Sequence, residues 1–354
     1  MIPYALIFFY TFFKSISSSV NTKPNKLEVF LIIFILTLFI GTRQEIGADW
    51  LIYLDFLERS KDLTISEIFN SREPIFRFLN SLFANSYYGI YFVNSICAFI
   101  FSFCVIKFCQ SLPNFWLALN ISIPYLVFVV GVGYTRQSVA LGIIMYGFTL
   151  LEKKQIFSYF LALLAAFAFH TSAIINSIYL FFFIRSKFLL NKFVYLIIFL
   201  TTAYLIYDFF ASKIITNLIG TYITWNFYQS EGGLIRLIML LIPSVIFLIF
   251  RRKFLIGNYL QNQVTIQSIL TIFLFIILKK YPLLSTPIDR LSLYLIPLQI
   301  TVFCYLVKIR LFNISTKLMK ILLLTYSSSV FFVWFNFSNH AFLWVPYRTI
   351  LFNF

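Results

Sequence analysis

Long apolar runs, separated by short polar segments, cover almost the whole chain. Many runs approach the roughly 20 residues that a helix needs to cross a bilayer core. We therefore expect an all-α, polytopic membrane helical bundle that forms a single domain over residues 1–354. The pattern predicts about twelve transmembrane helices, at residues 2–13, 27–41, 87–109, 114–131, 137–151, 155–169, 172–184, 192–210, 234–250, 264–280, 291–307 and 318–337. The pair 155–169 and 172–184 could instead form one kinked or re-entrant unit.

Composition and charge narrow the class of protein further. The chain is 61% hydrophobic and only 11% charged, which is far more apolar surface than a soluble domain of 354 residues needs. Its net charge of +16 comes from short basic clusters between apolar runs, so we expect no nucleic-acid partner. Four cysteines in or beside apolar runs and two histidines indicate neither a disulfide framework nor a typical zinc site. We expect no metal and no cofactor.

The basic clusters also predict an orientation. If the loop 14–26 is cytoplasmic and the spans alternate, most of the 28 Lys and Arg residues fall in the cytoplasm, with only Glu28 and Glu152 of the 12 acids. This asymmetry favours both termini outside. The cytoplasmic loops are short and hold no GxxxxGK[ST] motif and no DxD pair. We therefore expect neither ATP-driven work nor a metal-bound nucleotide-sugar site.

Unusual polar residues collect at the expected outer face. The loop 42–86 is the most polar part of the chain and favours a folded or amphipathic outer cap. The segment 131–140 places Arg136 between two apolar runs, where a guanidinium is costly unless it meets a partner or only snorkels at a helix end. The triplet Thr42-Arg43-Gln44 repeats Thr135-Arg136-Gln137. Arg43 could also form a mere surface ion pair with Asp49.

Three further polar sites belong to the same face. His170 is a lone histidine at an outer turn, and its alternative role is a helix–helix hydrogen bond. Asp289 and Arg290 stand together at another boundary. The tail 336–348 combines a second histidine with aromatic residues, which alternatively form an interfacial belt.

The arginines of this face, Arg43, Arg136, Arg290 and Arg348, indicate a ligand with several negative charges if they converge on one cavity. Guanidinium forks bind phosphate oxygens in pairs. Nearby Tyr and Trp rings suit sugars, whose C–H faces stack on aromatic side chains. A phospholipid-linked sugar has both parts and an apolar tail for the bilayer.

A set of short motifs, in order along nearly the whole chain, resembles the EpsG family of Wzy-like exopolysaccharide and O-antigen polymerases. The motifs are Arg43, Gly47-Ala48-Asp49, Tyr53, Glu73-Pro74, Phe76, Arg136-Gln137, Phe169-His170, Asp289-Arg290 and residues 344–348. The resemblance implies a glycosyltransferase of the bacterial inner membrane that works at its outer face. It would transfer one undecaprenyl-diphosphate-linked glycan as a block onto another, and undecaprenyl diphosphate would leave.

On this hypothesis, Arg136 and Arg290 hold the donor diphosphate, Arg43 supplements them, and Asp49 or His170 takes the proton of the acceptor hydroxyl. Further expected substrate-binding residues are Tyr53, Glu73, Tyr134, Gln137, Asp289, His340, Trp344, Tyr347 and Arg348. The expected partners are the two lipid-linked oligosaccharides, membrane lipid and a chain-length regulator. Two alternatives are a flippase or transporter of lipid-linked oligosaccharides, whose signature would be inverted repeats, and an O-antigen ligase-type transferase.

Overall fold

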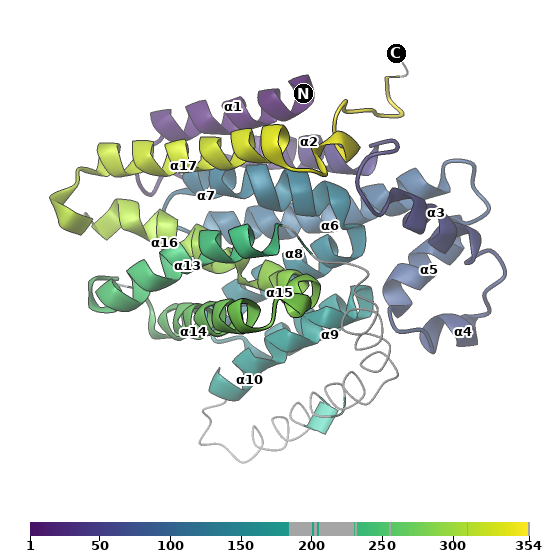
Figure 1. The fold of residues 1–354 in the computed structure, drawn as a ribbon. Coiled ribbons are helices and arrows are strands. Elements are labelled where there is room, and N and C mark those ends of the chain that lie inside the picture. Colours follow the sequence, from purple (N-terminus) through teal and green to yellow (C-terminus); the bar gives the residue numbers. More distant parts are fainter. Residues whose placement is uncertain are drawn as a thin grey trace. The chain divides into compact units, whose positions relative to one another are not determined.

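A computed structural model describes residues 1–183, 200, 201, 204, 230, 232–254, 256–309 and 311–352 (Figure 1). Within these ranges the chain forms helices and turns, with isolated β-bridges and no strand, which confirms the all-α prediction. The main elements are α1 (Ile2–Ser17), α2 (Lys26–Gly41), α3 (Trp50–Glu58), α4 (Ile65–Phe69), α5 (Pro74–Phe83), α6 (Gly89–Ser111), α7 (Phe115–Ser122), η1 (Ile123–Gly131), α8 (Thr135–Glu152), α9 (Ile156–Phe169), η2 (Thr171–Ser177), α10 (Ile178–Phe183), α13 (Gly233–Phe250), α14 (Asn258–Lys280), α15 (Ser285–Ser292), α16 (Ile296–Ile309) and α17 (Thr316–Phe337).

Each predicted span coincides with one or more of these helices, except that 192–210 lies almost entirely outside the described residues; α3, α4 and α5 fall in the predicted loop 42–86. Among the described residues, five helical stretches are long and apolar enough to cross a membrane: Gly89–Ser111, Gly233–Lys253, Asn258–Lys280, Pro282–Ile309 and Thr316–Phe337. Large apolar side chains such as Phe13, Phe34 and Ile249 point outward from the bundle, as lipid-facing residues do. The chain is therefore a multi-pass helical membrane protein, while the number of about twelve crossings stays a prediction.

The described chain forms two compact units. Unit 1 comprises Met1–Tyr146, Ala165–His170 and the chain from Phe303 onward, and unit 2 comprises Gly147–Leu164 and the described residues from Thr171 to Val302. Each unit is described separately below.

Aromatic side chains build the core of unit 1. The ring of Tyr4 lies 5.2 Å from that of Phe39, 5.0 Å from Phe128 and 4.7 Å from Phe335. The rings come from α1, α2, η1 and α17, so this one cluster joins four elements (Figure 1). Edge-to-face pairs of this kind stabilise a core beyond the area they bury. η1 is a π-helix, an unusual form that often marks functional sites, and it leads directly into the Arg136 segment.

The segment 42–86 folds into α3, α4 and α5, beside α6 (Figure 1). A reciprocal capping box between Thr64 and Glu67 starts α4, and Pro74 starts α5 at the position where a helix tolerates proline. Phe76 and Asn80, one turn apart, are buried. The segment is therefore folded, as the sequence predicts for a cap, and its position at the outer face stays a prediction.

Unit 2 contains the antiparallel pair α13 and α14, with α15 packed on both. Its buried centre is Leu237, Leu278 and Ile288, one from each helix. Leu237 lies one turn from the opening residue of α13, Gly233, so the packed centre is close to the helix end that carries Arg236.

Candidate functional site

Glu73 joins two residues that are distant in the sequence. Its Oε2 accepts a hydrogen bond from Arg136 Nη1 at 2.5 Å, and its Oε1 lies 2.5 Å from His170 Nδ1. The Glu73 side chain is 11% exposed, and those of Arg136 and His170 are each 22% exposed. Three of the residues expected in the site therefore form one partly buried cluster at the rim of unit 1.

Helix ends position all three side chains. Glu73 is the N-cap residue of α5, Arg136 lies in the first turn of α8, and His170 directly follows α9. Side chains at helix ends are held by a rigid scaffold and still reach solvent. The opening turn of α8 also places the positive end of the helix dipole near Arg136, which favours an anion.

Three aromatic rings surround the guanidinium of Arg136. Its central carbon lies 4.5 Å from the ring centre of Phe56, 5.7 Å from that of Phe76 and 5.9 Å from that of Tyr53. These distances lie within the range of cation–π attraction. The rings fix the side chain and shield its charge from water, so Arg136 is more than a snorkelling residue at a helix end.

The environment keeps Glu73 ionised. Burial by itself would raise the pKa of this carboxyl, but the hydrogen bond and charge of His170 and the charge of Arg136 outweigh burial. Together they lower the pKa of Glu73 from 4.5 to about 2. A carboxylate that is charged at neutral pH can orient the imidazole and stabilise its protonated form.

A close junction of three segments supports the start of α8. Gly47, at φ +98°, lies against Gly133, where a Cβ on Gly47 would come within 3.1 Å of the Gly133 Cα. A Cβ on Gly133 would in turn come within 2.5 Å of the Trp344 ring. The Gly47 amide donates to Leu343 O at 3.0 Å. Glycine is needed at 47 for its backbone angle and at 133 for this close approach.

Arg43 plays a different part from Arg136. It is 1% exposed, and it donates from Nη1 to Ile40 O at 2.5 Å and from Nη2 to Thr135 Oγ1 at 2.7 Å. No ion pair links it to Asp49 within the described chain, and its Nε has no hydrogen-bond partner there. Arg43 thus bonds to the residue preceding Arg136, which fits the supplementary, orienting role expected for it.

The other residues expected near the start of α8 differ in burial. Asp49 is half-buried beside α3, and Tyr53, one turn further on, is buried. Burial first, and then the charge of Asp49, raise the pKa of Tyr53 to about 12, so its hydroxyl keeps its proton at neutral pH. Tyr134 is half-buried before α8, and Gln137 is buried in its first turn.

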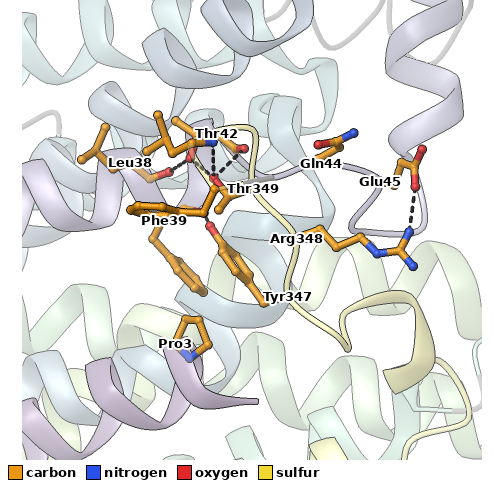
Figure 2. Close-up of a pocket in the computed structure, with 11 residues that line it drawn as sticks. Pro3, Leu38, Phe39, Thr42, Gln44, Glu45, Tyr347, Arg348 and Thr349 are labelled. Carbon is orange, nitrogen blue, oxygen red and sulfur yellow. Dashed lines mark hydrogen bonds and ion pairs between the residues drawn. The ribbon is translucent and has the colours of Figure 1, made fainter. Parts of the chain in front are cut away.

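The tail residues divide between packing and a groove. Trp344 is 1% exposed, and its Nε1 donates to Phe128 O at 2.8 Å, so its ring serves the core in this conformation. Tyr347 and Arg348 line a groove of about 900 Å³, with the ring of Tyr347 stacked on Phe39 (Figure 2). Arg348 pairs with Glu45 at 2.8 Å on the exposed rim. His340 is exposed and lies outside the groove lining.

The groove combines an apolar wall with a polar rim. Its remaining lining residues are Pro3, Leu38, Thr42, Gln44, Thr349, Leu351 and Phe352. Pro3 stands at the start of α1, Leu38 belongs to the last turn of α2, Thr42 and Gln44 follow that helix, and the others belong to the tail (Figure 2). Both ends of the described chain therefore meet at one end of unit 1, and which side of the membrane this is stays a prediction.

Unit 2 holds a separate charged pair. Arg236, in α13, donates from Nε and Nη2 to the two carboxylate oxygens of Asp289, which also accepts from the Ser230 hydroxyl at 3.0 Å. Asp289 is buried, and the adjacent Arg290 is half-buried at the end of α15. Both carboxylate oxygens of Asp289 accept hydrogen bonds in this ion pair. The substrate-binding role expected for Asp289 stays a prediction.

Sequence reasoning missed Arg236 and the pair Phe56 and Arg77. Arg236 lies inside a predicted span, and an intramembrane arginine is by itself a signal of a buried partner. Arg77 stands four residues after Glu73, which is one helical turn. Within the described ranges, no group of three or more His, Cys, Asp or Glu side chains is arranged to hold a metal ion, and metal independence stays a prediction.

The fold and these contacts define a multi-pass helical membrane protein with a charged cluster at the helix ends. The EpsG family profile matches residues 26–349, and the chain belongs to this family of Wzy-like polymerases. The match covers every motif that carries the resemblance, and it indicates a polysaccharide polymerase of the glycosyltransferase type. No curated protein and no solved structure matches the chain.

Proposed function

We propose that the protein polymerises polysaccharide repeat units at the outer face of the bacterial cytoplasmic membrane. The donor is a glycan on undecaprenyl diphosphate, and the acceptor is a hydroxyl of a second lipid-linked repeat unit. Membership of the EpsG family supports the reaction class. The contact of Glu73 with both Arg136 and His170 is the observation that carries the proposed site.

In this proposal His170 is the general base. When its Nδ1–H donates to Glu73, the other ring nitrogen, Nε2, carries a lone pair that can accept a proton. Glu73 fixes that tautomer and stabilises the imidazolium that forms, in the same way that a buried acid orients a catalytic histidine. Asp49, the other base candidate, caps α3 without a side-chain hydrogen bond and forms no ion pair in the described part of the chain, so His170 is favoured.

The bonds and charges of the step balance without a redox partner. The acceptor oxygen attacks C1 of the donor sugar, its proton moves to His170 Nε2, and the bond between C1 and the diphosphate oxygen breaks. The electron pair leaves with undecaprenyl diphosphate, whose negative charge grows at the leaving oxygen. Arg136 is proposed to stabilise this charge from a preorganised position. Arg290 belongs to unit 2, and its expected part in holding the diphosphate stays a prediction from the sequence.

The groove of Figure 2 is proposed to hold the isoprenoid tail of a lipid-linked substrate. Its apolar wall of Phe39 and Leu351 suits hydrocarbon, and the rim of Gln44 and Arg348 suits the polar group at the head of the chain. The tail residues Tyr347 and Arg348 would then bind substrate as expected from the sequence, and Trp344 would support them from the core.

A deletion strain tests the function. Loss of a polymerase should leave single lipid-linked repeat units and remove the ladder of longer glycans, and the wild-type gene should restore the ladder. A flippase predicts the loss of translocated single units instead. A ligase predicts an intact lipid-linked ladder that is not passed to its final acceptor. Restoration by the wild type but not by His170→Ala, at equal abundance, would support the base; a full ladder from His170→Ala would remove it.

A further inference from the structure

Arg77 lies beside this cluster and forms no ion pair within the described residues. It belongs to α5, one turn after Glu73, and its side chain is half-buried. Its guanidinium carbon lies 4.5 Å from the centre of the Phe56 ring, the same distance as that of Arg136. The two guanidinium carbons are therefore no further apart than twice this distance. One aromatic ring thus contacts both guanidinium groups.

The nearby carboxylates are already engaged by other residues. Asp55 accepts from Arg59 Nε at 2.8 Å, and Glu73 is bound to Arg136 and His170. In the part of the chain that the structure describes, the Arg77 guanidinium has neither a hydrogen bond nor an ion pair. Arg77 therefore has no carboxylate bound to it directly, and the charges of Glu73 and Asp55 act on it only from a distance.

Electrostatics make this arrangement unfavourable unless an anion is bound. Burial and, next, the like charge of Arg136 lower the pKa of Arg77, although an arginine stays charged at neutral pH. Two guanidinium groups held near each other and partly out of water repel each other. A group with two negative charges would neutralise Arg77 and share Arg136, whose Nε is also without a partner.

We infer that Arg77 and Arg136, held by Phe56, form a binding site for a diphosphate. This inference rests on the proposed function, and it assigns the donor leaving group to residues of unit 1. It adds Arg77 as a binding residue that no motif indicated. The half-buried Phe56 ring acts as the positioning residue, because both guanidinium groups lie over it.

Binding of isoprenoid probes to the purified full-length protein tests the site. The probes are farnesyl diphosphate, farnesyl phosphate and farnesol, titrated by intrinsic tryptophan fluorescence. The wild type should bind the diphosphate about tenfold or more tightly than the alcohol, since each charge-assisted hydrogen bond contributes about 1.5–3 kcal/mol. Arg77→Ala and Arg77→Gln should lose about tenfold for the diphosphate and little for farnesol, while Arg77→Lys should fall between them.

Two controls complete the experiment. Arg72→Ala removes an exposed arginine of the same segment and should leave all affinities unchanged. Phe56→Leu should weaken diphosphate binding even though both arginines remain, because their common support is gone. Equal diphosphate affinity in the wild type and in both Arg77→Ala and Arg77→Gln would overturn the site. So would a wild type that does not prefer the diphosphate to the alcohol.

A parallel polymerisation assay with lipid-linked repeat units separates this inference from the proposed function. If the wild type polymerises and Arg77 variants bind diphosphate normally, the assignment of Arg77 fails and the polymerase stands. If diphosphate binding depends on Arg77 but the wild type makes no polymer, the anion site stands and the proposed reaction fails. If both hold, Arg77→Ala should raise KM for the donor more than it lowers kcat, as expected for ground-state binding.

Discussion

The triplets Thr42-Arg43-Gln44 and Thr135-Arg136-Gln137 have the same sequence and opposite surroundings. Arg43 is fully buried and donates hydrogen bonds to a backbone carbonyl and to the Thr135 hydroxyl. Arg136 keeps part of its side chain exposed, and it meets a carboxylate and three aromatic rings. The first arginine reaches the second triplet and bonds to its threonine. A motif repeated in sequence can therefore supply one buried supporting arginine and one arginine that stays partly exposed beside a carboxylate.

The largest expected effect concerns Arg136. Arg136→Lys keeps the charge but loses the fork that can contact Glu73 and a phosphate together. We expect polymerisation to fall about 10²–10³-fold, the usual cost of one preorganised charge-stabilising contact, with normal abundance in the membrane. Glycan ladders at matched expression measure it. Arg59→Lys, an exposed arginine paired with Asp55, is the control and should polymerise normally. Near-normal ladders from Arg136→Lys would return Arg136 to a snorkelling role.

Glu73→Gln removes the carboxylate that pairs with Arg136 but not with Arg43. Removing one partner of a buried ion pair commonly costs on the order of 3 kcal/mol, so the variant should unfold at a lower temperature in detergent. The folded-state pKa of Glu73, about 2, lies below its usual 4.5, so its contribution to stability is full above about pH 4.5 and is lost as the pH falls towards 2. The wild type should therefore lose stability across this acid window, and Glu73→Gln should lose less. Parallel acid profiles of both proteins would contradict the ion pair.

Arg43→Lys should affect folding more than chemistry. An ammonium group is unable to reproduce the two-pronged contact with Ile40 O and Thr135 Oγ1, so we expect a loss of about 2 kcal/mol. Lower abundance with nearly normal polymerisation per folded molecule would sharpen the contrast with Arg136. Thr135→Val, which removes this acceptor and also the hydrogen bond that Thr135 Oγ1 donates to Asn94 Oδ1, should give a loss in the same direction. A well-folded but inactive Arg43→Lys would instead place Arg43 in direct contact with substrate.

The smallest effect is expected at Arg348. Its ion pair with Glu45 is more than half exposed at both ends, and pairs of this kind contribute about 0–1 kcal/mol. Arg348→Ala should therefore leave the melting temperature almost unchanged. A fall in polymerisation of more than a fewfold would show that the groove rim contacts substrate through Arg348, whereas normal ladders would limit the groove to its apolar wall.

The sequence predicted the helices well because each apolar run carries its own signal. The predicted spans 27–41 and 318–337 nearly coincide with α2 and α17, since the length of a run and its flanking polar residues decide where a membrane helix begins and ends. The interruption at η1 was not foreseen, because its residues are as apolar as those of a regular helix. Helix type within an apolar run depends on packing and leaves little trace in composition.

The site was predicted only as a list of residues. Glu73, Arg136 and His170 were each expected, but their contact depends on folding that brings together positions 63 and 97 residues apart. Arg77 was overlooked because an arginine in a polar loop is unremarkable until its carboxylate neighbours are found to be occupied. Trp344 carried an expected role in sugar binding, whereas the structure buries its ring against Gly133. Burial of an aromatic residue near a helix end is a three-dimensional property that spacing alone does not give.

The junction of Gly47, Gly133 and Trp344 has a consequence for biosynthesis. Residues 42–47 and 128–133 are synthesised early, but the residues that hydrogen-bond to them include Leu343, Trp344 and Thr349. The start of α8, and with it Arg136, therefore lacks its support until translation has passed residue 349. A nascent chain that is already in the membrane but lacks this segment would contain Arg136 without these supporting contacts. The order of synthesis thus delays the moment at which the surroundings of Arg136 are complete.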